Sequence, residues 1–287
     1  MNDYVIFSDS GCDASDEMFD AWGVKHRSLT FVFTDSPTQY SNDDMPVEVF
    51  YEKMRGGGVA KTSAVNIETF IWAFEEELKA GRDILYLGFS TGLSTTANSA
   101  EAAAKELSPK YPERRIVTVD TLCASGGEGL IVYLASLQKK AGKSIDEVAE
   151  FVKSKIPHLC HWFTVEDLVY LKRGGRVSPT VALVGSLLGI KPVMHVDDEG
   201  HLTKVSTARG RKASIKALAD KYAELCTDTD APVFISHGDC EKDARILADM
   251  LRERCGAKDI TLTFIGPVIG AHAGPGTIAL FFVGKKR

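Results

Sequence analysis

Three short segments are rich in hydroxyl side chains that can hold a negatively charged group: residues 9–13, 61–63 and 90–96. We interpret each as a loop that follows, or nearly follows, a strand, and the last leads into an alanine-rich helix. Hydroxyls and backbone N–H groups at the N-terminus of a helix are suited to binding an anion. Serine and threonine also cap helices and build turns, which is their commonest role. The three segments therefore indicate an anion site or ordinary turns, and both interpretations stay open.

The segment Gly88–Gly92 matches the pattern G-x-S-x-G, which carries the nucleophile of many α/β hydrolases. Asp120 and His272 follow Ser90 in the order that those enzymes use, so a serine-hydrolase triad is the alternative hypothesis. Two observations count against it. The glycine-rich oxyanion motif of such enzymes is missing upstream, and the hydroxyl cluster continues past Ser90, although a hydrolase needs only one nucleophile. We therefore rank the hydrolase below the anion site.

His272 lies in the segment Gly270–Gly276, inside a stretch (residues 265–284) that contains no Lys, Arg, Asp or Glu. The flanking glycines let the backbone and a ligand approach each other closely. An imidazole can hydrogen-bond a carboxylate or orient a hydroxyl that does so. We therefore predict a functional role for His272. The prolines and glycines of this stretch argue against a lone membrane-spanning helix, so we interpret it as a loop followed by a buried strand.

Positive charge gathers in two segments, Lys172–Arg176 and Arg209–Lys212. A basic loop at a helix end is favoured by the helix dipole and needs no partner. The alternative is a docking site for an acidic or phosphate-bearing partner, and the sequence leaves both open. The histidines lack metal-ligand spacing, because His158 and His161 would point to opposite faces of a strand. We therefore predict no metal.

The elements that must position these residues alternate in type through the first half of the chain. Apolar runs at residues 4–8, 29–33, 84–87 and 116–119 predict strands, and helical patterns follow them. Ser144 and Glu147 have the spacing of a capping box at the start of one such helix. This alternation predicts an α/β fold in which a parallel sheet has helices on both faces, a three-layer N-terminal domain.

The pattern changes after Pro157. Two strand-like runs, residues 190–196 and 201–206, flank the turn Asp197–Gly200 and predict a β-hairpin. A hairpin within an α/β pattern predicts a second domain with a mixed sheet. We place an N-terminal domain at residues 1–157 and a C-terminal one at 158–287. The apolar run 181–190 and the uncharged stretch either pack in the core or line a cavity, and both interpretations stay open.

The bulk composition excludes several classes of function. The chain of 287 residues has a net charge of −5, which argues against nucleic acid as the main partner because backbone binding needs a basic surface. Its six cysteines are scattered without a C-x-x-C pair, so a disulfide scaffold is not expected and a reducing cytoplasm fits best. No segment reads as a secretory signal or a membrane span.

Five motifs, in order along the chain, resemble those of the DegV family of bacterial fatty-acid-binding proteins, which includes the FakB subunits of fatty acid kinase. They are Phe7–Asp13, Lys61–Ser63, Ser90–Thr95, Leu171–Ser178 and Gly270–Gly276. Each motif is weak alone, but five of them in order at matching spacing are specific. The resemblance implies two α/β domains with an acyl chain buried between them.

The resemblance also implies a site and a partner. The ligand-binding residues would be Thr62, Ser63, Ser94, Thr95 and His272. Arg173 and Arg176 would engage a separate ATP-dependent kinase, which phosphorylates the bound carboxylate for phospholipid synthesis. The chain would then be a carrier and not itself an enzyme, with a fatty acid as its ligand and no cofactor. The sequence departs from the family pattern at Ala64, Thr95 and Ala271–Ala273, and the last change removes two hydroxyls beside the histidine.

Overall fold

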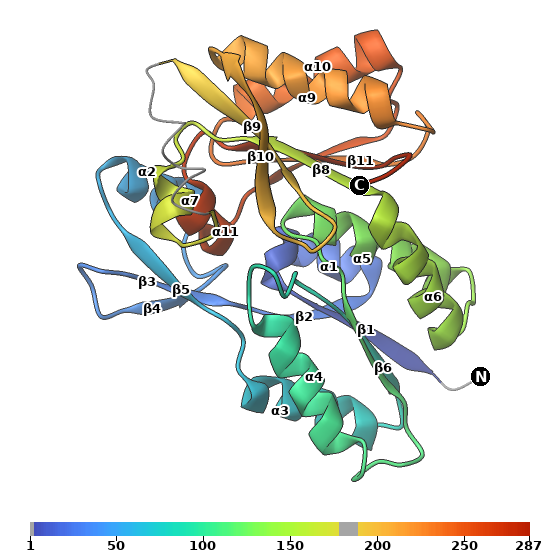
Figure 1. Ribbon diagram of the computed structural model, residues 1–287. Helices are drawn as coiled ribbons and strands as arrows, with labels where there is room; N and C mark the ends of the chain where they lie inside the picture. The colour runs from blue at the N-terminus through green and yellow to red at the C-terminus, as the bar shows by residue number, and fades with distance from the viewer. Residues whose placement is uncertain (1–2, 178–188) are drawn as a thin grey trace.

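Four parallel strands, in the order β2-β1-β6-β7, form the sheet of the N-terminal half (Figure 1). The computed structural model describes residues 3–177 and 189–287. The strands are β1 (Tyr4–Asp9), β2 (Val24–Arg27), β6 (Asp83–Gly88) and β7 (Ile116–Asp120). The predicted parallel sheet is therefore confirmed. The sequence analysis missed β2, because Val24-Lys25-His26-Arg27 lacks an apolar run.

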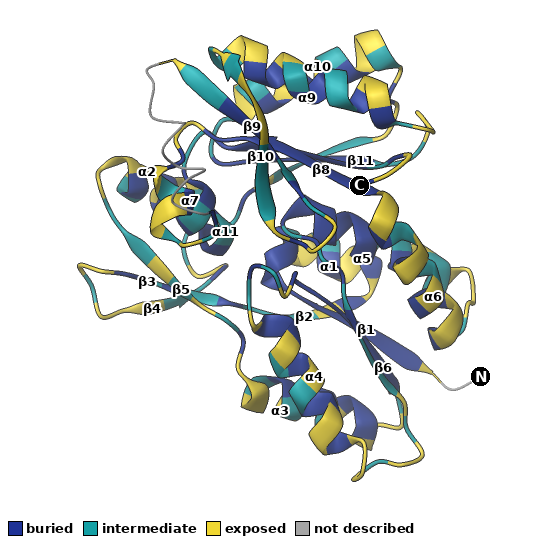
Figure 2. Cartoon of the chain, in the orientation of Figure 1, coloured by how far each residue is buried: buried dark blue, intermediate teal, exposed yellow. Residues whose placement is uncertain are grey.

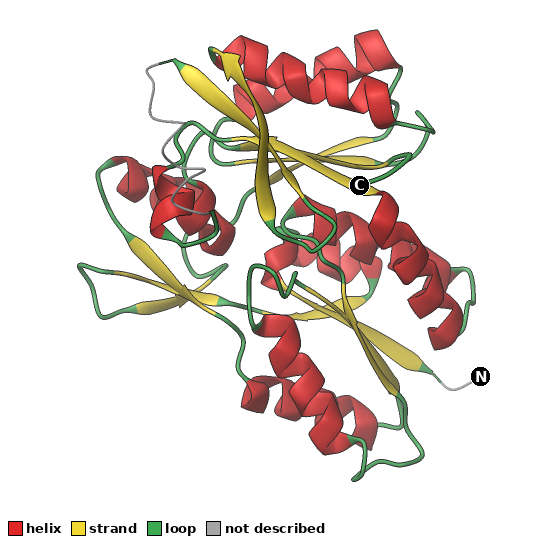
Figure 3. Cartoon of the chain, viewed as in Figure 1, coloured by secondary structure: helices red, strands yellow, loops and turns green. Residues whose placement is uncertain are grey.

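Helices cover both faces of this sheet, as predicted (Figure 3). Strand β1 shows why both faces need a cover, because its successive side chains point to opposite faces of the sheet. Tyr4 and Ile6 belong to one core, and Val5 and Phe7 belong to the other. The first core is covered by α1 (Asp16–Trp22), α5 (Gly126–Lys140) and α6 (Ile145–Lys155), and the second by α3 (Ile67–Lys79) and α4 (Thr96–Leu107). The predicted capping box of Ser144 and Glu147 opens α6.

A separate three-stranded antiparallel sheet corrects two predictions. It contains β3 (Thr30–Phe33), β4 (Gln39–Ser41) and β5 (Ala60–Ser63), and α2 (Val47–Arg55) joins β4 to β5. The run at residues 29–33 is thus a strand, but not of the parallel sheet. Residues 61–63 form a strand instead of a loop, because they pair with β3, about 30 residues earlier in the chain.

The C-terminal half has a six-stranded mixed sheet in the order β10-β9-β8-β13-β11-β12. Only the pair β11–β12 is parallel, and the predicted hairpin forms β9 and β10. Its strands are β8 (Leu159–Thr164), β9 (Ile190–Val196), β10 (Leu202–Arg209), β11 (Val233–His237), β12 (Ile260–Phe264) and β13 (Ile278–Val283). Helices α9 (Arg211–Leu225) and α10 (Glu241–Cys255) cover its outer face.

Helix α5 packs between the two sheets and joins the halves into one continuous core. Its first seven residues, Gly126–Val132, are all buried, and Figure 2 shows much of α5 in dark blue. Glycine is needed there, since a Cβ on Gly127 would lie 2.1 Å from His161 Nε2 and one on Gly126 would lie 2.6 Å from Ser236 Oγ. The domain boundary at residue 157 stays a prediction; the short helix η2 (Ile156–His158) leads there into β8.

The uncharged stretch 265–284 contains a helix that the sequence analysis read as a loop. Helix α11 (Pro267–Ala273) is followed by β13. The predicted strand is therefore confirmed, but the predicted loop is wrong. Pro267 suits the first turn of a helix, and Gly270 allows the approach of Tyr51, whose hydroxyl would lie 2.5 Å from a Cβ. Among the described residues, no helix is long and apolar enough to cross a membrane.

Two shorter helices complete the described chain: η1 (Ser10–Cys12) after β1, and α7 (Val169–Arg173) after β8. Most of the apolar run 181–190, considered above as core or as cavity lining, lies outside the described residues.

Candidate functional site

A cavity of about 1000 Å³ lies between the two halves of the chain. The N-terminal half lines it with β5 and with the loop between β6 and α4. The C-terminal half lines it with β8, the β9–β10 hairpin, the end of α7, α11 and β13. Most of the lining is apolar, including Phe89, Phe163, Val196, Leu202, Ile269 and Phe281. A largely apolar cavity that also offers some polar groups is typical of a site for a small ligand with an apolar body.

Polar side chains from β5, α11 and the loop before α4 are among those that line this cavity. Thr62 Oγ1 lies 2.8 Å from His272 Nε2, although the two residues are 210 positions apart in the chain. Ser94 and Thr95 line the same cavity and precede the N-terminus of α4. Four of the five residues predicted to bind the ligand, Thr62, Ser94, Thr95 and His272, therefore line one cavity.

Ser63 does not join them. It is exposed and is not among the described residues that line the cavity. Because residues 60–63 form a strand, the side chains of Thr62 and Ser63 point to opposite faces. Ser63 pairs with Thr30 of β3. The strand, which the sequence analysis did not predict, thus separates two neighbouring hydroxyls that the family pattern groups together.

His272 is a neutral imidazole in this site. Burial, with a further contribution from the positive charge of Arg176, lowers the pKa of His272 from 6.5 to about 4. Its Nδ1 is buried and has no hydrogen-bond partner among the described residues. A carboxylate bound to Thr62 requires the threonine hydroxyl hydrogen, so His272 Nε2–H must then donate to Thr62 Oγ1. The imidazole would thereby orient the hydroxyl.

The His272→Gln variant is expected to lose less stability in acid than the wild type does. At pH 7 the imidazole is mostly neutral in both the folded and the unfolded chain. Between pH 6.5 and 4 only the unfolded chain binds the proton, so the free energy of unfolding falls as the pH drops, by about 2–3 kcal/mol near pH 4.5. Urea unfolding at about pH 7 and 4.5 measures this. An equal fall in His272→Gln and the wild type would contradict the assignment.

Ser94 and Thr95 keep donor capacity at the start of α4. Ser94 Oγ accepts from the backbone N–H of Thr96 at 3.2 Å and lies 2.9 Å from Thr96 Oγ1. Thr95 is exposed and makes no side-chain capping bond to α4. The first backbone N–H groups of this 12-residue helix carry partial positive charge. This arrangement suits an anion.

Helix α11 is held at both ends, which fixes the position of His272. Asp13 accepts a hydrogen bond from Gly266 N at 2.9 Å, and Asn42 accepts one from Val268 N at 3.0 Å. At the other end the Thr277 hydroxyl donates to the carbonyls of Ala273 and Gly274, each at 2.9 Å. The N-terminal half therefore positions an imidazole that belongs to the C-terminal half.

The first hydroxyl-rich segment, residues 9–13, has a structural role and contributes none of the described cavity lining. The carboxylate of Asp9 is buried and accepts hydrogen bonds from Tyr86 Oη at 2.6 Å and from Gly11 N at 2.9 Å. Burial raises the pKa of Asp13 to about 8, against the opposing effect of its bond from Ser125. For this segment the interpretation as turns and caps fits better than a ligand site.

The two arginines predicted to bind a partner differ in their surroundings. The Arg176 guanidinium donates from Nε and Nη2 to the Leu93 carbonyl at 3.2 and 3.1 Å, so it ties its turn to the loop before α4. Arg173 is exposed, and its guanidinium lies 5.7 Å from the ring centroid of Tyr170. Arg173 forms no ion pair with another described residue. Of the two, Arg173 is free to meet a partner.

The hydrolase triad is not assembled. Ser90 is buried, and its hydroxyl donates to the Gly200 carbonyl at 2.9 Å. Asp120 accepts from the Thr91 backbone and hydroxyl, while His272 contacts Thr62. Within the described residues, no hydrogen bond joins any two members of the proposed triad. The geometry therefore gives Ser90 no general base.

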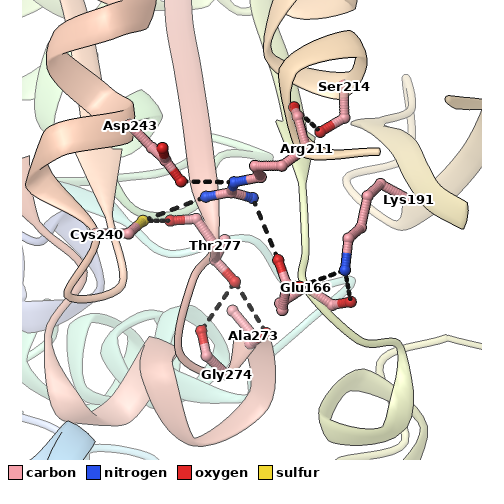
Figure 4. Close-up of polar contacts among 9 residues, drawn as sticks. All are labelled: Glu166, Lys191, Arg211, Ser214, Cys240, Asp243, Ala273, Gly274 and Thr277. Carbon is pink, nitrogen blue, oxygen red and sulfur yellow. Dashed lines mark hydrogen bonds and ion pairs between the residues drawn. The ribbon is translucent and has the colours of Figure 1, made fainter. Parts of the chain in front are cut away.

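In the second basic segment, residues 209–212, the side chain of Arg211 is engaged in polar contacts with other elements (Figure 4). Arg211 Nε donates to Asp243 of α10 at 2.8 Å, and Arg211 Nη1 lies 3.9 Å from Glu166 Oε2. Lys191 also pairs with Glu166. Arg211 thus links α9, α10 and the segment before α7, which leaves it poorly placed for docking.

One cluster of possible metal ligands involves none of the residues that the sequence analysis considered. Ligand atoms of Asp16, His26 and Asp43 lie within 4.8 Å of one another, and His26 Nε2 is 3.4 Å from Asp16 Oδ1. They come from α1, β2 and the loop after β4, so local spacing could not reveal them. Exposed acidic groups commonly gather without an ion, and we assign no metal to this cluster.

Sequence reasoning also missed the contribution of the β9–β10 hairpin and of His161 to the cavity lining. The hairpin was predicted, but its contact with the N-terminal half has no local signal. His161 was considered only as a metal ligand. Strand alternation could have indicated its inward position once Leu159 and Phe163 were taken as core residues.

Comparisons with known proteins agree with this architecture. The family model described as "Uncharacterised protein, DegV family COG1307" matches residues 3–285. A DegV domain-containing protein of Clostridium perfringens is 44% identical over 291 residues, which is 100% of this chain and 99% of the relative.

Two solved structures match over nearly the full length. A Thermotoga maritima protein, described as revealing a fatty acid binding function, has a TM-score of 0.83 at 28% identity and covers 99% of this chain and 100% of its own. A DegV family protein of Ruminococcus gnavus with vaccenic acid has a TM-score of 0.86 at 26% identity and covers 97% and 99%.

Proposed function

The chain belongs to the DegV family, and from this premise we propose that it binds a long-chain fatty acid and presents the carboxylate to a separate ATP-dependent kinase. One observation carries the proposal: a largely apolar cavity of about 1000 Å³ is lined by the contacting pair Thr62 and His272 and by the hydroxyls of Ser94 and Thr95. The vaccenic acid of one solved relative and the fatty acid binding function described for the other support the same class of ligand.

The acyl chain would occupy the apolar part of the cavity. Burying a long hydrocarbon removes apolar surface from water, which contributes about 0.8 kcal/mol for each CH₂ group. Side chains from both halves, such as Phe89 and Phe281, line this part. A ligand between residues 1–157 and 158–287, the two domains that we propose, would be enclosed by both.

The carboxylate would be held by hydroxyls in place of an ion pair. Thr62 and Ser94 would donate to it, with support from Thr95, and His272 would orient the Thr62 hydroxyl. The N-terminus of α4 and the nearby charge of Arg176 favour the ionised form. A carboxylate without a direct ion pair keeps an oxygen available as a nucleophile for phosphoryl transfer.

The kinase would approach at the turn that follows α7. Lys172, Gly175 and Arg176 line the cavity, and the exposed Arg173 lies among them in the sequence. A partner that contacts Arg173 would therefore lie beside the carboxylate. In this proposal the kinase supplies ATP and the chemistry in the cytoplasm, this chain supplies the substrate, and it needs no cofactor of its own.

A displacement assay tests the ligand class. Delipidated protein is loaded with a fluorescent fatty acid and titrated with palmitic acid or with methyl palmitate. The free acid is expected to displace the probe at least about tenfold better, because the ester cannot accept charge-assisted hydrogen bonds. Equal displacement by acid and ester would contradict the proposed head-group site, and no uptake of any fatty acid would contradict the function.

A further inference from the structure

The tip of the β9–β10 hairpin forms a wall of the cavity. Val196, His201, Leu202 and Thr203 all line it. Leu202 packs against both of the large core clusters that the N-terminal sheet separates. The hairpin therefore covers the space that, on the proposed function, the acyl chain occupies.

This tip is weakly tied to its own sheet. Strand β10 is the sheet edge, and β9 pairs with β8 only at residues 193–195. Beyond that point the hairpin reaches toward the N-terminal half (Figure 1). Its turn is closed locally, because Asp197 accepts hydrogen bonds from the backbone of Glu199 and of His201. The tip is thus a small unit that is internally rigid.

Ser90 provides the attachment to the N-terminal half. Its hydroxyl donates to the Gly200 carbonyl at 2.9 Å and accepts from Gly92 N at 3.1 Å. Within the described residues, this is the one hydrogen bond between residues 197–203 and the N-terminal half. The backbones also meet closely, since a Cβ on Gly92 would lie 2.9 Å from the Gly200 oxygen, and one on Gly200 would lie 2.2 Å from Ser90 Oγ.

We propose that Ser90 is a positioning residue that latches the hairpin over the cavity, and that a fatty acid enters and leaves when this latch opens. The inference rests on the proposed function and gives a role to the serine of the G-x-S-x-G segment. Ser90 itself is not among the described lining residues, so it acts through the hairpin and not on the ligand.

A latch and a ligand-binding residue differ in their kinetic signature. The bond between Ser90 and Gly200 involves no ligand atom, so its loss should favour opening equally in the loaded and the empty protein. The rate constants for association and dissociation should then rise together while the dissociation constant stays the same. Loss of a ligand contact would instead raise the dissociation constant.

Stopped-flow measurements with cis-parinaric acid, a naturally fluorescent fatty acid, separate these cases. In Ser90→Ala both rate constants are expected to rise about three- to tenfold, the effect of losing one buried neutral hydrogen bond. Ser136→Ala is the matched control, because Ser136 is also buried but its hydroxyl bonds the Tyr133 carbonyl within α5. It should leave both constants unchanged.

Unchanged rate constants in Ser90→Ala, or a faster dissociation without faster association that raises the dissociation constant, would overturn the latch. Should Ser90→Ala fail to fold, Gly92→Ala tests the same contact from the other side, because its methyl would push against the Gly200 carbonyl and should speed release. Wild-type protein that takes up no parinaric acid would refute the proposed function. If the wild type takes up parinaric acid and the variants show wild-type rate constants, the latch is refuted and the proposed function is not.

Discussion

Replacing Thr62 with valine and Ser94 with alanine together is expected to weaken fatty-acid binding by roughly two to four orders of magnitude. Each hydroxyl is a proposed donor to an ionised carboxylate, and a hydrogen bond to a charged group is worth about 1.5–3 kcal/mol. Valine keeps the shape of Thr62, so the cavity wall stays filled while the donor and its bond to His272 disappear. Equilibrium titration with a fluorescent fatty acid measures the loss.

Ser63→Ala is the matched control for this result. Ser63 is the next residue of β5, but it is exposed and lies outside the described lining, so its loss should leave the affinity within about twofold of the wild type. If the double variant binds within about threefold of the wild type, the head group is held elsewhere. If Ser63→Ala weakens binding as strongly as the double variant, Ser63 also contacts the ligand, and its placement on the face of β5 away from the cavity is wrong.

A second large effect is expected on acyl-phosphate formation by the kinase. Arg173→Ala is expected to lower acyl-phosphate formation about tenfold or more in a reconstituted reaction with the kinase, at limiting carrier concentration, and to leave fatty-acid affinity unchanged. Its guanidinium is exposed, forms no ion pair within the described chain, and lies beside the cavity-lining turn. Loss of a charge-assisted contact with the partner would have an effect of this size.

Arg209→Ala is the control for general loss of positive charge, because Arg209 is also exposed and belongs to the second basic segment. It should support acyl-phosphate formation at the wild-type rate. Equal activity of Arg173→Ala and the wild type would remove Arg173 from the docking surface. A parallel loss of fatty-acid binding in Arg173→Ala would show that the residue acts on the cavity and not on the partner.

Much of the fold could be predicted from local patterns. The buried strands β1 and β6, the hairpin at Asp197–Gly200 and the capping box of Ser144 all have signals within a few residues. The elements that were missed depend on distant partners. Strand β2 is polar in sequence, and β5 exists because it pairs with β3. Helix α11 is short and rich in small residues, so its pattern resembles a loop.

The candidate site could be predicted from local sequence patterns less well than the fold. Thr62 and His272 meet across 210 residues, and only the resemblance to a family linked them in advance. The same resemblance included Ser63, which strand alternation turns away from the cavity. No sequence pattern indicates the hydrogen bond between Ser90 and Gly200, because it forms only when the hairpin of one sheet reaches a loop of the other.

Native mass spectrometry of protein purified gently from a bacterial host shows whether this chain carries a fatty acid. We expect a mass above that of the chain by the mass of one long-chain fatty acid, which organic extraction removes. The Thr62→Val and Ser94→Ala double variant should lose most of this added mass. If the wild-type protein shows only the mass of the bare chain, and takes up no fatty acid when it is offered, the chain is not a fatty-acid carrier.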